Sequence, residues 1–345
     1  MLVVSNLDDR VPKDHPLRPI KGLADGVLKD LSASFGRMYA KTGRPSVPPE
    51  RLLKGMLLIA LFSIRSERQL CEQLQYNLLF RWFLDMDLVE DVFDASTFSH
   101  NRKRLMKHSA PQKFFARVVA KAVEEGLMSH EHFSVDGTLI DAWASLKSFK
   151  PKDDNDDDSD SNGWSDFKGK SRKNDTHESK TDPEAKLMRK GNGKEAKLSY
   201  AGHALMENRN GLLVDLRISE ANGRAERELA TAMMRDHLSP GATLGADAGY
   251  NTRDFVAQCR TRGVSPHVAG KMRSSAIDGR TTRHASYAAS QTVRKRIEQI
   301  FGWLKTVAGL RKTRFKGRER TEAYAVMAGA AYNLLRIGKL REATA

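Results

Sequence analysis

Apolar residues recur at helical spacing through the first 130 positions of the chain. The segment from 51 to 64 is apolar on most helical faces, and Val47-Pro48-Pro49-Glu50 precedes it. Proline is favoured in the first turn of a helix, and a helix without a polar face is normally buried. The pattern therefore predicts a buried helix in the centre of an all-α N-terminal domain, residues 1–130.

Two further helix starts in this region are marked by capping residues. Ser66 and Gln69 have capping-box spacing before a helix at 70–79. Asp94 can cap the free N–H groups of another helix, and Phe93 and Phe98 then occupy the two positions of a hydrophobic staple.

The pattern changes to strands after residue 131. Residues 132–137 are predicted to form a strand that stops at Gly137, and Asn210-Gly211 between apolar runs at 198–206 and 212–218 predicts a hairpin. Alternating helices and strands follow, with helices expected at 225–238, 251–262, 292–305 and 322–340 and strands at 242–247 and 264–268. This order predicts an α/β domain over 131–345, a mixed sheet with flanking helices.

A polar insertion interrupts this domain at about 148–186. It contains the acidic run 153–160, followed by many Lys, Ser and Gly residues. Such a segment buries too little apolar area to offset its ordering entropy, so we expect it to be disordered or loosely held. The run lacks the glycine and the closing glutamate of an EF-hand loop, which disfavours a calcium site.

The charge of the chain indicates a polyanionic partner. The formal net charge is +15 and the sequence pI is about 9.8, and 13 Lys and Arg against 4 Glu lie from residue 291 onward. A basic chain neutralises phosphates and releases counterions, so nucleic acid is the preferred partner. The densest cluster is Arg311, Lys312, Arg314, Lys316, Arg318 and Arg320.

Other classes of protein receive little support. Cys71 and Cys259 are too few and too far apart for a disulfide framework or a zinc site, and are expected to be small buried hydrophobes. The N-terminus lacks a secretory pattern, and the longest apolar run, 56–62, is too short to span a bilayer. We therefore expect a cytoplasmic protein without a membrane partner.

Two aspartates occupy equivalent positions in the predicted strands. Asp136 precedes Gly137 at the end of one strand, and Asp247 precedes Ala248-Gly249 at the end of another. On neighbouring strands they would bridge a divalent ion, for which hard oxygen ligands favour Mg²⁺ or Mn²⁺. The alternative is that each aspartate is simply a turn residue beside a glycine.

A glutamate on a later helix extends this pattern. At 100° per residue, Arg294, Glu298 and Lys305 fall within about 40° of one another on one helix face. An apolar stripe beside them would pack the helix on the sheet, holding Glu298 at its edge with the two basic residues as phosphate contacts. The alternative is an ordinary i,i+4 ion pair between Arg294 and Glu298.

Three blocks of the sequence resemble the catalytic blocks of bacterial insertion-sequence DDE transposases of the IS-four/IS-five-type superfamily. They are FSVDGTLIDAWAS, TLGADAGYNT and VRKRIEQIFGWLKTVAGLRKTRFKG. The family's third block reads Tyr-x2-Arg-x3-Glu-x6-Lys, and Arg294, Glu298 and Lys305 lie at those offsets. Gln291 stands at the tyrosine position, which the IS-five-type group commonly relaxes, so that group is the nearer resemblance.

The resemblance implies an RNase H-like catalytic domain and a helical N-terminal domain that binds DNA. It implies that Asp136, Asp247 and Glu298 hold two Mg²⁺ or Mn²⁺ ions, about 4 Å apart. Water would cleave the element ends, and the freed 3′-ends would attack target DNA. Double-stranded DNA, as terminal inverted repeats and as target, is the implied partner, with a homodimer or higher multimer on DNA.

Candidate DNA contacts lie on both sides of the catalytic blocks. They are Arg102, Lys103 and Arg104 on the helix after Asp94, with Arg294, Lys305, Arg311, Lys312 and Arg314 near the C-terminus. A solvated basic face is the alternative for any single helix of this kind. His203 and His267 are expected to be structural or DNA-facing, and Asp141 is a weaker carboxylate candidate.

Two other functions remain open at this point. A nuclease of the same fold would cut DNA without joining it, and it would need the same three carboxylates. A DNA-binding repressor derived from a transposase would need none of them, so Asp136→Ala would leave its function unchanged.

Overall fold

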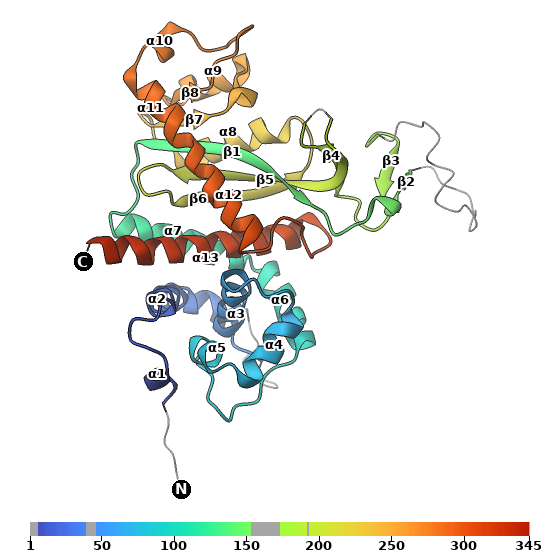
Figure 1. Ribbon diagram of the computed structural model, residues 1–345, viewed down its shortest axis with the longest axis vertical. Coiled ribbons are helices and arrows are strands. Elements are labelled where there is room, and N and C mark those ends of the chain that lie inside the picture. The colour runs from blue at the N-terminus through green and yellow to red at the C-terminus, as the bar shows by residue number, and fades with distance from the viewer. Residues whose placement is uncertain (1–5, 39–45, 153–172, 192, 345) are drawn as a thin grey trace.

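The computed structural model describes residues 6–38, 46–152, 173–191 and 193–344. In the described ranges seven helices form the N-terminal region; the first six lie below the long C-terminal helix and the seventh lies alongside it (Figure 1). They are α1 (Leu7–Arg10), α2 (Leu17–Gly36), α3 (Pro49–Leu61), α4 (Glu67–Tyr76), α5 (Leu78–Phe83), α6 (Ala95–Lys107) and α7 (Ala110–Glu124). Helix α3 is buried along almost its whole length, as its apolar pattern predicts.

The predicted capping residues begin two of these helices. Ser66 accepts a hydrogen bond from the N–H of Gln69 at 3.1 Å, and Asp94 accepts one from Thr97 at 2.9 Å. The rings of Phe93 and Phe98 lie 5.9 Å apart, which confirms the hydrophobic staple at the start of α6.

The described residues from 132 onward form a curved mixed sheet with helices on its faces, and a separate two-stranded sheet of β2 and β3. Its elements are β1 (His132–Asp141), β2 (Phe149–Pro151), β3 (His177–Ser179), β4 (Lys186–Arg189), β5 (Ala196–Glu207), β6 (Leu213–Glu220), α8 (Ala225–His237), β7 (Thr243–Ala246), α9 (Arg253–Thr261), β8 (Ser265–Val268), α10 (Gly279–Thr282), α11 (Ala285–Val293), α12 (Ile297–Thr306) and α13 (Arg318–Thr344). Figure 1 shows α12 crossing the sheet and α13 lying between the sheet and the N-terminal helices.

The strand order is that of an RNase H-like sheet. Strands β6, β5 and β1 are antiparallel neighbours, whereas β7 and β8 continue the sheet parallel to β1. Strand β4 pairs with the first residues of β5, on the edge that β6 then follows. The fold class predicted from the sequence is therefore confirmed, together with the helical N-terminal region.

Strand β1 is longer than its sequence suggests. The prediction that it stops at Gly137 is wrong, because β1 pairs with β5 as far as Asp141↔Ser199. Its parallel pairing with β7, however, ends at Ser134↔Gly245. Asp136 thus lies just beyond the last residue of β1 that pairs with β7. The pairing of β1 with β5 continues past Asp136 and holds it rigidly.

The flanks of the polar insertion form strands, in contrast to the disorder expected there. Strands β2 and β3 pair with each other, and Tyr200 donates a hydrogen bond to buried Asp182 at 2.7 Å. Residues 153–172, which hold the acidic run, lie outside the described residues.

Helix α13 packs closely against the sheet and the N-terminal helices. A Cβ added to Gly329 would lie 2.8 Å from Cδ2 of Leu213, so glycine permits this close approach. Asn333 is fully buried and bonds both the N–H and the C=O of Leu213, at 2.9 and 2.7 Å. Its amide thereby satisfies backbone groups at the start of β6. None of the helices in the described ranges has the length and apolarity needed to cross a membrane.

Candidate active site

Asp136 and Asp247 occupy corresponding places on two neighbouring strands. Each lies two residues beyond the last paired positions of the β1–β7 ladder, Ser134 and Gly245. Both side chains are half-buried. Oδ1 of Asp136 accepts the N–H of Gly137 at 2.8 Å, and Oδ1 of Asp247 accepts the N–H of Gly249 at 2.7 Å. The parallel register thus brings together two aspartates that are far apart in the sequence.

The electrostatic environment of Asp136 disfavours its ionised form. Burial, with the negative charges of Asp247 and Glu226, raises the pKa of Asp136 to about 6. The N–H of Gly137 and the charge of Arg294 act in the opposite direction. A carboxylate held near other carboxylates gains most from a nearby cation, and Asp136 and Asp247 are two hard oxygen ligands of the kind that a divalent ion binds.

Sequence reasoning missed Glu226, in the first turn of α8. Its Oε1 would lie only 2.6 Å from a Cβ on Gly137, and it accepts a hydrogen bond from the hydroxyl of buried Tyr250 at 3.2 Å. Burial and the charge of Asp247 raise the pKa of Glu226. The only signal available beforehand was Gly137 itself, because glycine in a strand often marks a close approach.

Helix α12 lies over the strand face that carries Asp136. Arg294 precedes this helix, and its Cβ would lie 3.4 Å from a Cβ on Gly245. At the other end, Nζ of Lys305 donates to Oγ1 of Thr138 at 2.5 Å. Glu298 stands between these two contacts, and its side chain is exposed. Within the described ranges, no three His, Cys, Asp or Glu side chains lie in an arrangement that could hold a metal ion.

Besides Arg294 and Lys305, which donate to Gln291 and Thr138, two further predicted DNA contacts are engaged within the protein. Arg102 pairs with Glu67, and its guanidinium lies 4.9 Å from the centre of the Phe315 ring. Burial and the nearby charges of Arg320 and Arg314 lower the pKa of Arg102 to about 10. Arg314 donates to the carbonyl of Ile64 at 2.8 Å and to the hydroxyl of Tyr324 at 3.1 Å. Both side chains therefore connect the N-terminal helices to the segment after α12.

The remaining four predicted contacts are more accessible. Lys103, Arg104, Arg311 and Lys312 are exposed. The backbone of Arg311 accepts the N–H of Asp141 at 3.0 Å, which fixes this basic loop to the end of β1. Oδ2 of Asp141 lies 3.7 Å from Nζ of Lys197. Asp141 therefore belongs to the contact between the end of β1 and the basic loop, and it is separate from the aspartate pair.

The two histidines considered beforehand are buried. Nε2 of His203 lies 2.9 Å from the hydroxyl of Ser219, and the His267 ring packs edge-on against Tyr287. Burial lowers the pKa of each histidine to about 4, so both are neutral at neutral pH.

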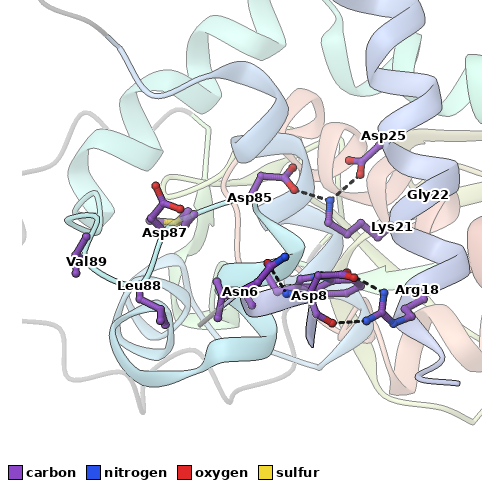
Figure 2. Close-up of a pocket in the computed structure, with 13 residues that line it drawn as sticks. Asn6, Asp8, Arg18, Lys21, Gly22, Asp25, Asp85, Asp87, Leu88 and Val89 are labelled. Carbon is purple, nitrogen blue, oxygen red and sulfur yellow. Dashed lines mark hydrogen bonds and ion pairs between the residues drawn. The ribbon is translucent and has the colours of Figure 1, made fainter. Parts of the chain in front are cut away.

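A large hollow in the N-terminal helices lies apart from these groups. It has a volume of about 710 Å³, and Figure 2 shows Lys21 between Asp25 and Asp85, at 2.7 and 2.5 Å. Buried Lys54 pairs with the same two aspartates. Asp8 and Asp87 also line the hollow, so its carboxylates would repel a phosphate. The network is best explained as support for the packing of α2, α3 and the loop after α5.

Comparison with protein families identifies the chain. Residues 129–334, more than half of the sequence, match the family described as Transposase DDE domain. The chain belongs to the DDE transposase family. Residues 5–104 match a second family, described as Transposase domain (DUF772), so the helical part of this transposase also resembles known transposase sequences.

Solved structures similar to the transposase are distant. The piggyBac transposase synaptic complex with hairpin DNA is 9% identical, with 95% of this chain and 76% of that chain covered and a TM-score of 0.46. The Mos1 transposase paired-end complex with left transposon end is 10% identical, with 92% and 87% covered and a TM-score of 0.21. These likenesses are too remote to assign roles to individual residues.

Proposed function

We propose that this DDE transposase binds the terminal inverted repeats of an insertion sequence, cleaves the element ends and joins the 3′-ends to target DNA. Membership in the IS-five-type group is part of the proposal. So is a division into a DNA-binding domain, 1–130, and a catalytic domain, 131–345. The observation that carries it is the juxtaposition of Asp136 and Asp247 in a chain of this family.

Asp136 and Asp247 would provide the fixed part of a metal site. The rigid pairing of β1 with β5 holds Asp136, and the turn after β7 holds Asp247. The chemistry that two Mg²⁺ or Mn²⁺ ions supply at such a site is activation of the attacking oxygen and stabilisation of the leaving 3′-oxygen.

Glu298 is proposed as the third ligand. It lies on α12 between Arg294, which precedes the helix, and Lys305, and both of these residues approach strands of the aspartate pair. Its side chain is exposed, and it would have to move toward the aspartate pair when cations and DNA bind. Arg294 and Lys305 would orient the phosphodiester beside it.

The DNA partner is inferred from charge and family. The net charge of +15 and the exposed basic residues Lys103, Arg311 and Lys312 suit a phosphate backbone. Assembly as a homodimer or higher multimer on two DNA ends is proposed with it.

Cleavage of DNA that carries the element's inverted repeats tests the assignment. We expect Mg²⁺- or Mn²⁺-dependent cleavage by the wild type and at least about a hundredfold loss in Asp136→Asn, Asp247→Asn and Glu298→Gln. Glu319→Gln, an exposed glutamate at the start of α13, is the matched control. Cleavage by Glu298→Gln at the wild-type rate would remove Glu298 from the site.

A second substrate separates a transposase from a nuclease of the same fold. With pre-cut 3′-ends and a plasmid target, the proposed function requires covalent joining of the two DNAs. Cleavage of intact ends without any joining of pre-cut ends would identify an enzyme that only cuts.

A further inference from the structure

A basic hollow lies where α12 and α13 meet the β5–β6 turn. It has a volume of about 290 Å³ and is lined by Asn210, Gly211, Arg296, Gln299, Tyr332 and Arg336. This lining contains two guanidinium groups, two amides and a phenol, and it contains no carboxylate. Its volume is about ten times the roughly 30 Å³ of a water molecule in the liquid, so it has room for a hydrated phosphate group.

Internal contacts hold the walls of the hollow in place. Nε of Arg336 donates to the carbonyl of Asn210 at 2.7 Å, and the hydroxyl of Tyr332 donates to the carbonyl of Gly211 at 3.0 Å. The Tyr332 ring packs edge-on against Trp303 of α12. Because only Nε of Arg336 is used, and the described residues offer its terminal nitrogens no acceptor, these nitrogens remain available to a ligand.

The turn below the hollow is also rigid. Buried Glu207 accepts the N–H groups of Arg209 and Asn210, at 2.6 and 2.9 Å, and the hydroxyl of Ser129 at 2.8 Å. Its carboxylate is thus occupied within the turn. The hollow is therefore formed before any ligand arrives, which lowers the ordering cost of binding.

The position of the hollow relates it to the proposed active site. Gln299 is the neighbour of Glu298 on α12, and the turn residue Asn208 bonds both the backbone of His132 and the hydroxyl of Ser134. From His132 to Asp136 the strand rises by about 13 Å, at about 3.3 Å per residue. One strand of B-DNA advances about 3.4 Å per nucleotide, so His132, which this turn binds, lies about four nucleotide steps from Asp136.

We propose that this hollow is a binding site for a backbone phosphate of the DNA strand that enters the active site. Arg296 and Arg336 would take the phosphate oxygens, and Gln299 would donate a further hydrogen bond. The site would fix the register of the strand without reading its bases. The inference rests on the proposed function, because it takes DNA as the substrate.

The affinity for a duplex DNA of arbitrary sequence, measured against salt concentration without divalent ions, tests the site. Arg296→Gln removes one cation from the hollow, and Gln299→Glu places an anion there at an exposed position. Lys339→Gln is the control: it changes the charge by the same amount on α13, outside the lining. All variants are first compared with the wild type by thermal unfolding.

In Arg296→Gln we expect the slope of log affinity against log salt to fall by about 0.9, the value for one lost phosphate contact. Gln299→Glu should weaken binding about tenfold, and Lys339→Gln should retain the wild-type slope. DNA that carries the element's inverted repeat, which gives the complex one register, with a neutral methylphosphonate at successive positions gives a second measurement. At one position the wild type should lose affinity and Arg296→Gln should lose none.

Three outcomes would contradict the site. The first is that Arg296→Gln and Gln299→Glu keep the wild-type slope of log affinity against log salt. The second is that Lys339→Gln loses as much of this slope as Arg296→Gln does. The third is that no methylphosphonate position weakens binding of the wild type while leaving that of Arg296→Gln unchanged. If the wild type still cleaves element ends, each of these removes the hollow and leaves the proposed function intact. A wild type that binds no DNA would remove both.

Discussion

Glu226 of α8 occupies the space that a side chain at position 137 would take. A Cβ on Gly137 would lie 2.6 Å from Oε1 of Glu226 and 3.1 Å from its Cδ. The same glutamate contributes a negative charge to the environment of Asp136. The glycine therefore determines which carboxylates share this end of the sheet.

Gly137→Ala should displace Glu226 from the aspartate pair. Such a close contact must be relieved by moving the glutamate or the strand, and overpacking of this kind costs about 1–3 kcal/mol of unfolding free energy. Chemical denaturation measures the loss. Gly26→Ala is the control, because nothing lies within 4 Å of a Cβ there, and in the exposed middle of α2 alanine should stabilise by about 0.5–1 kcal/mol. Equal effects of the two substitutions would show that Glu226 does not depend on the glycine.

Glu226→Gln should lower the pKa of Asp136. The charge of Glu226 is one of the causes that raise this pKa to about 6, so its removal stabilises the ionised carboxylate of Asp136. Carbon-13 NMR of labelled aspartate, with Asp136→Asn to assign the resonance, follows the titration. Glu228→Gln, an exposed residue in the same turn, should leave the titration unchanged. An unaltered midpoint in Glu226→Gln would contradict the coupling of the two carboxylates.

Asp136→Asn should stabilise the metal-free protein at neutral pH. Because the folded-state pKa of Asp136 lies above its ordinary value of 3.8, the folded state loses stability as the pH rises from 3.8 through about 6. Ionising Asp136 in the folded state lowers the free energy of unfolding by about 1–3 kcal/mol. This loss is complete above about pH 6 and absent well below pH 3.8. Asparagine avoids this cost, so the gain on substitution should disappear in acid. Denaturation at several pH values, with exposed Asp175→Asn as the control, measures the difference. A gain that is the same at pH 3 and pH 7 would contradict this explanation.

Arg102→Gln should reduce stability more than it reduces DNA affinity. Arg102 pairs with Glu67 and covers the Phe315 ring, so its loss leaves a largely buried carboxylate unpaired and should cost about 1–3 kcal/mol. Its neighbour Lys103 is exposed, and Lys103→Gln should change stability by less than about 0.5 kcal/mol. Thermal unfolding and DNA binding of both variants separate the two roles. A stable Arg102→Gln with weakened DNA binding would restore the original interpretation of Arg102 as a DNA contact.

The roles of Arg102 and Arg314 show where sequence reasoning reached its limit. Their local patterns are those of basic surface residues, and their partners Glu67 and Ile64 lie far away in the sequence. Residue spacing along the chain does not predict such long-range contacts. Glu226 was missed for the same reason, because it approaches Asp136 from another helix and is marked in the sequence only by Gly137.

Local patterns, in contrast, predicted much of the fold. The caps at Ser66 and Asp94, the hairpin at Asn210-Gly211 and the strand before Asp247 all depend on residues within a few positions of one another. The correspondence of Asp136 with Asp247 was predicted from two similar strand ends, but only Asp247 follows the end of a strand, because β1 continues beyond Asp136. The continuation of β1 to Asp141 could not be predicted, because its pairing with β5 depends on residues about 60 positions away.

Divalent cations should stabilise the wild type, and they should reverse the order of stability of the wild type and Asp136→Asn. Ions that bind only the folded state add about 2.7 kcal/mol of stability at a concentration of 100 times Kd. Asp136→Asn and Asp247→Asn should lose most of this gain, whereas Asp175→Asn should retain it. Asp136→Asn is thus expected to be more stable than the wild type without Mg²⁺ and less stable with saturating Mg²⁺. Thermal unfolding with and without MgCl₂, at constant ionic strength, measures both rankings without relying on DNA cleavage. An equal rise in the melting temperature of all four proteins would show that the cation binds away from the aspartate pair.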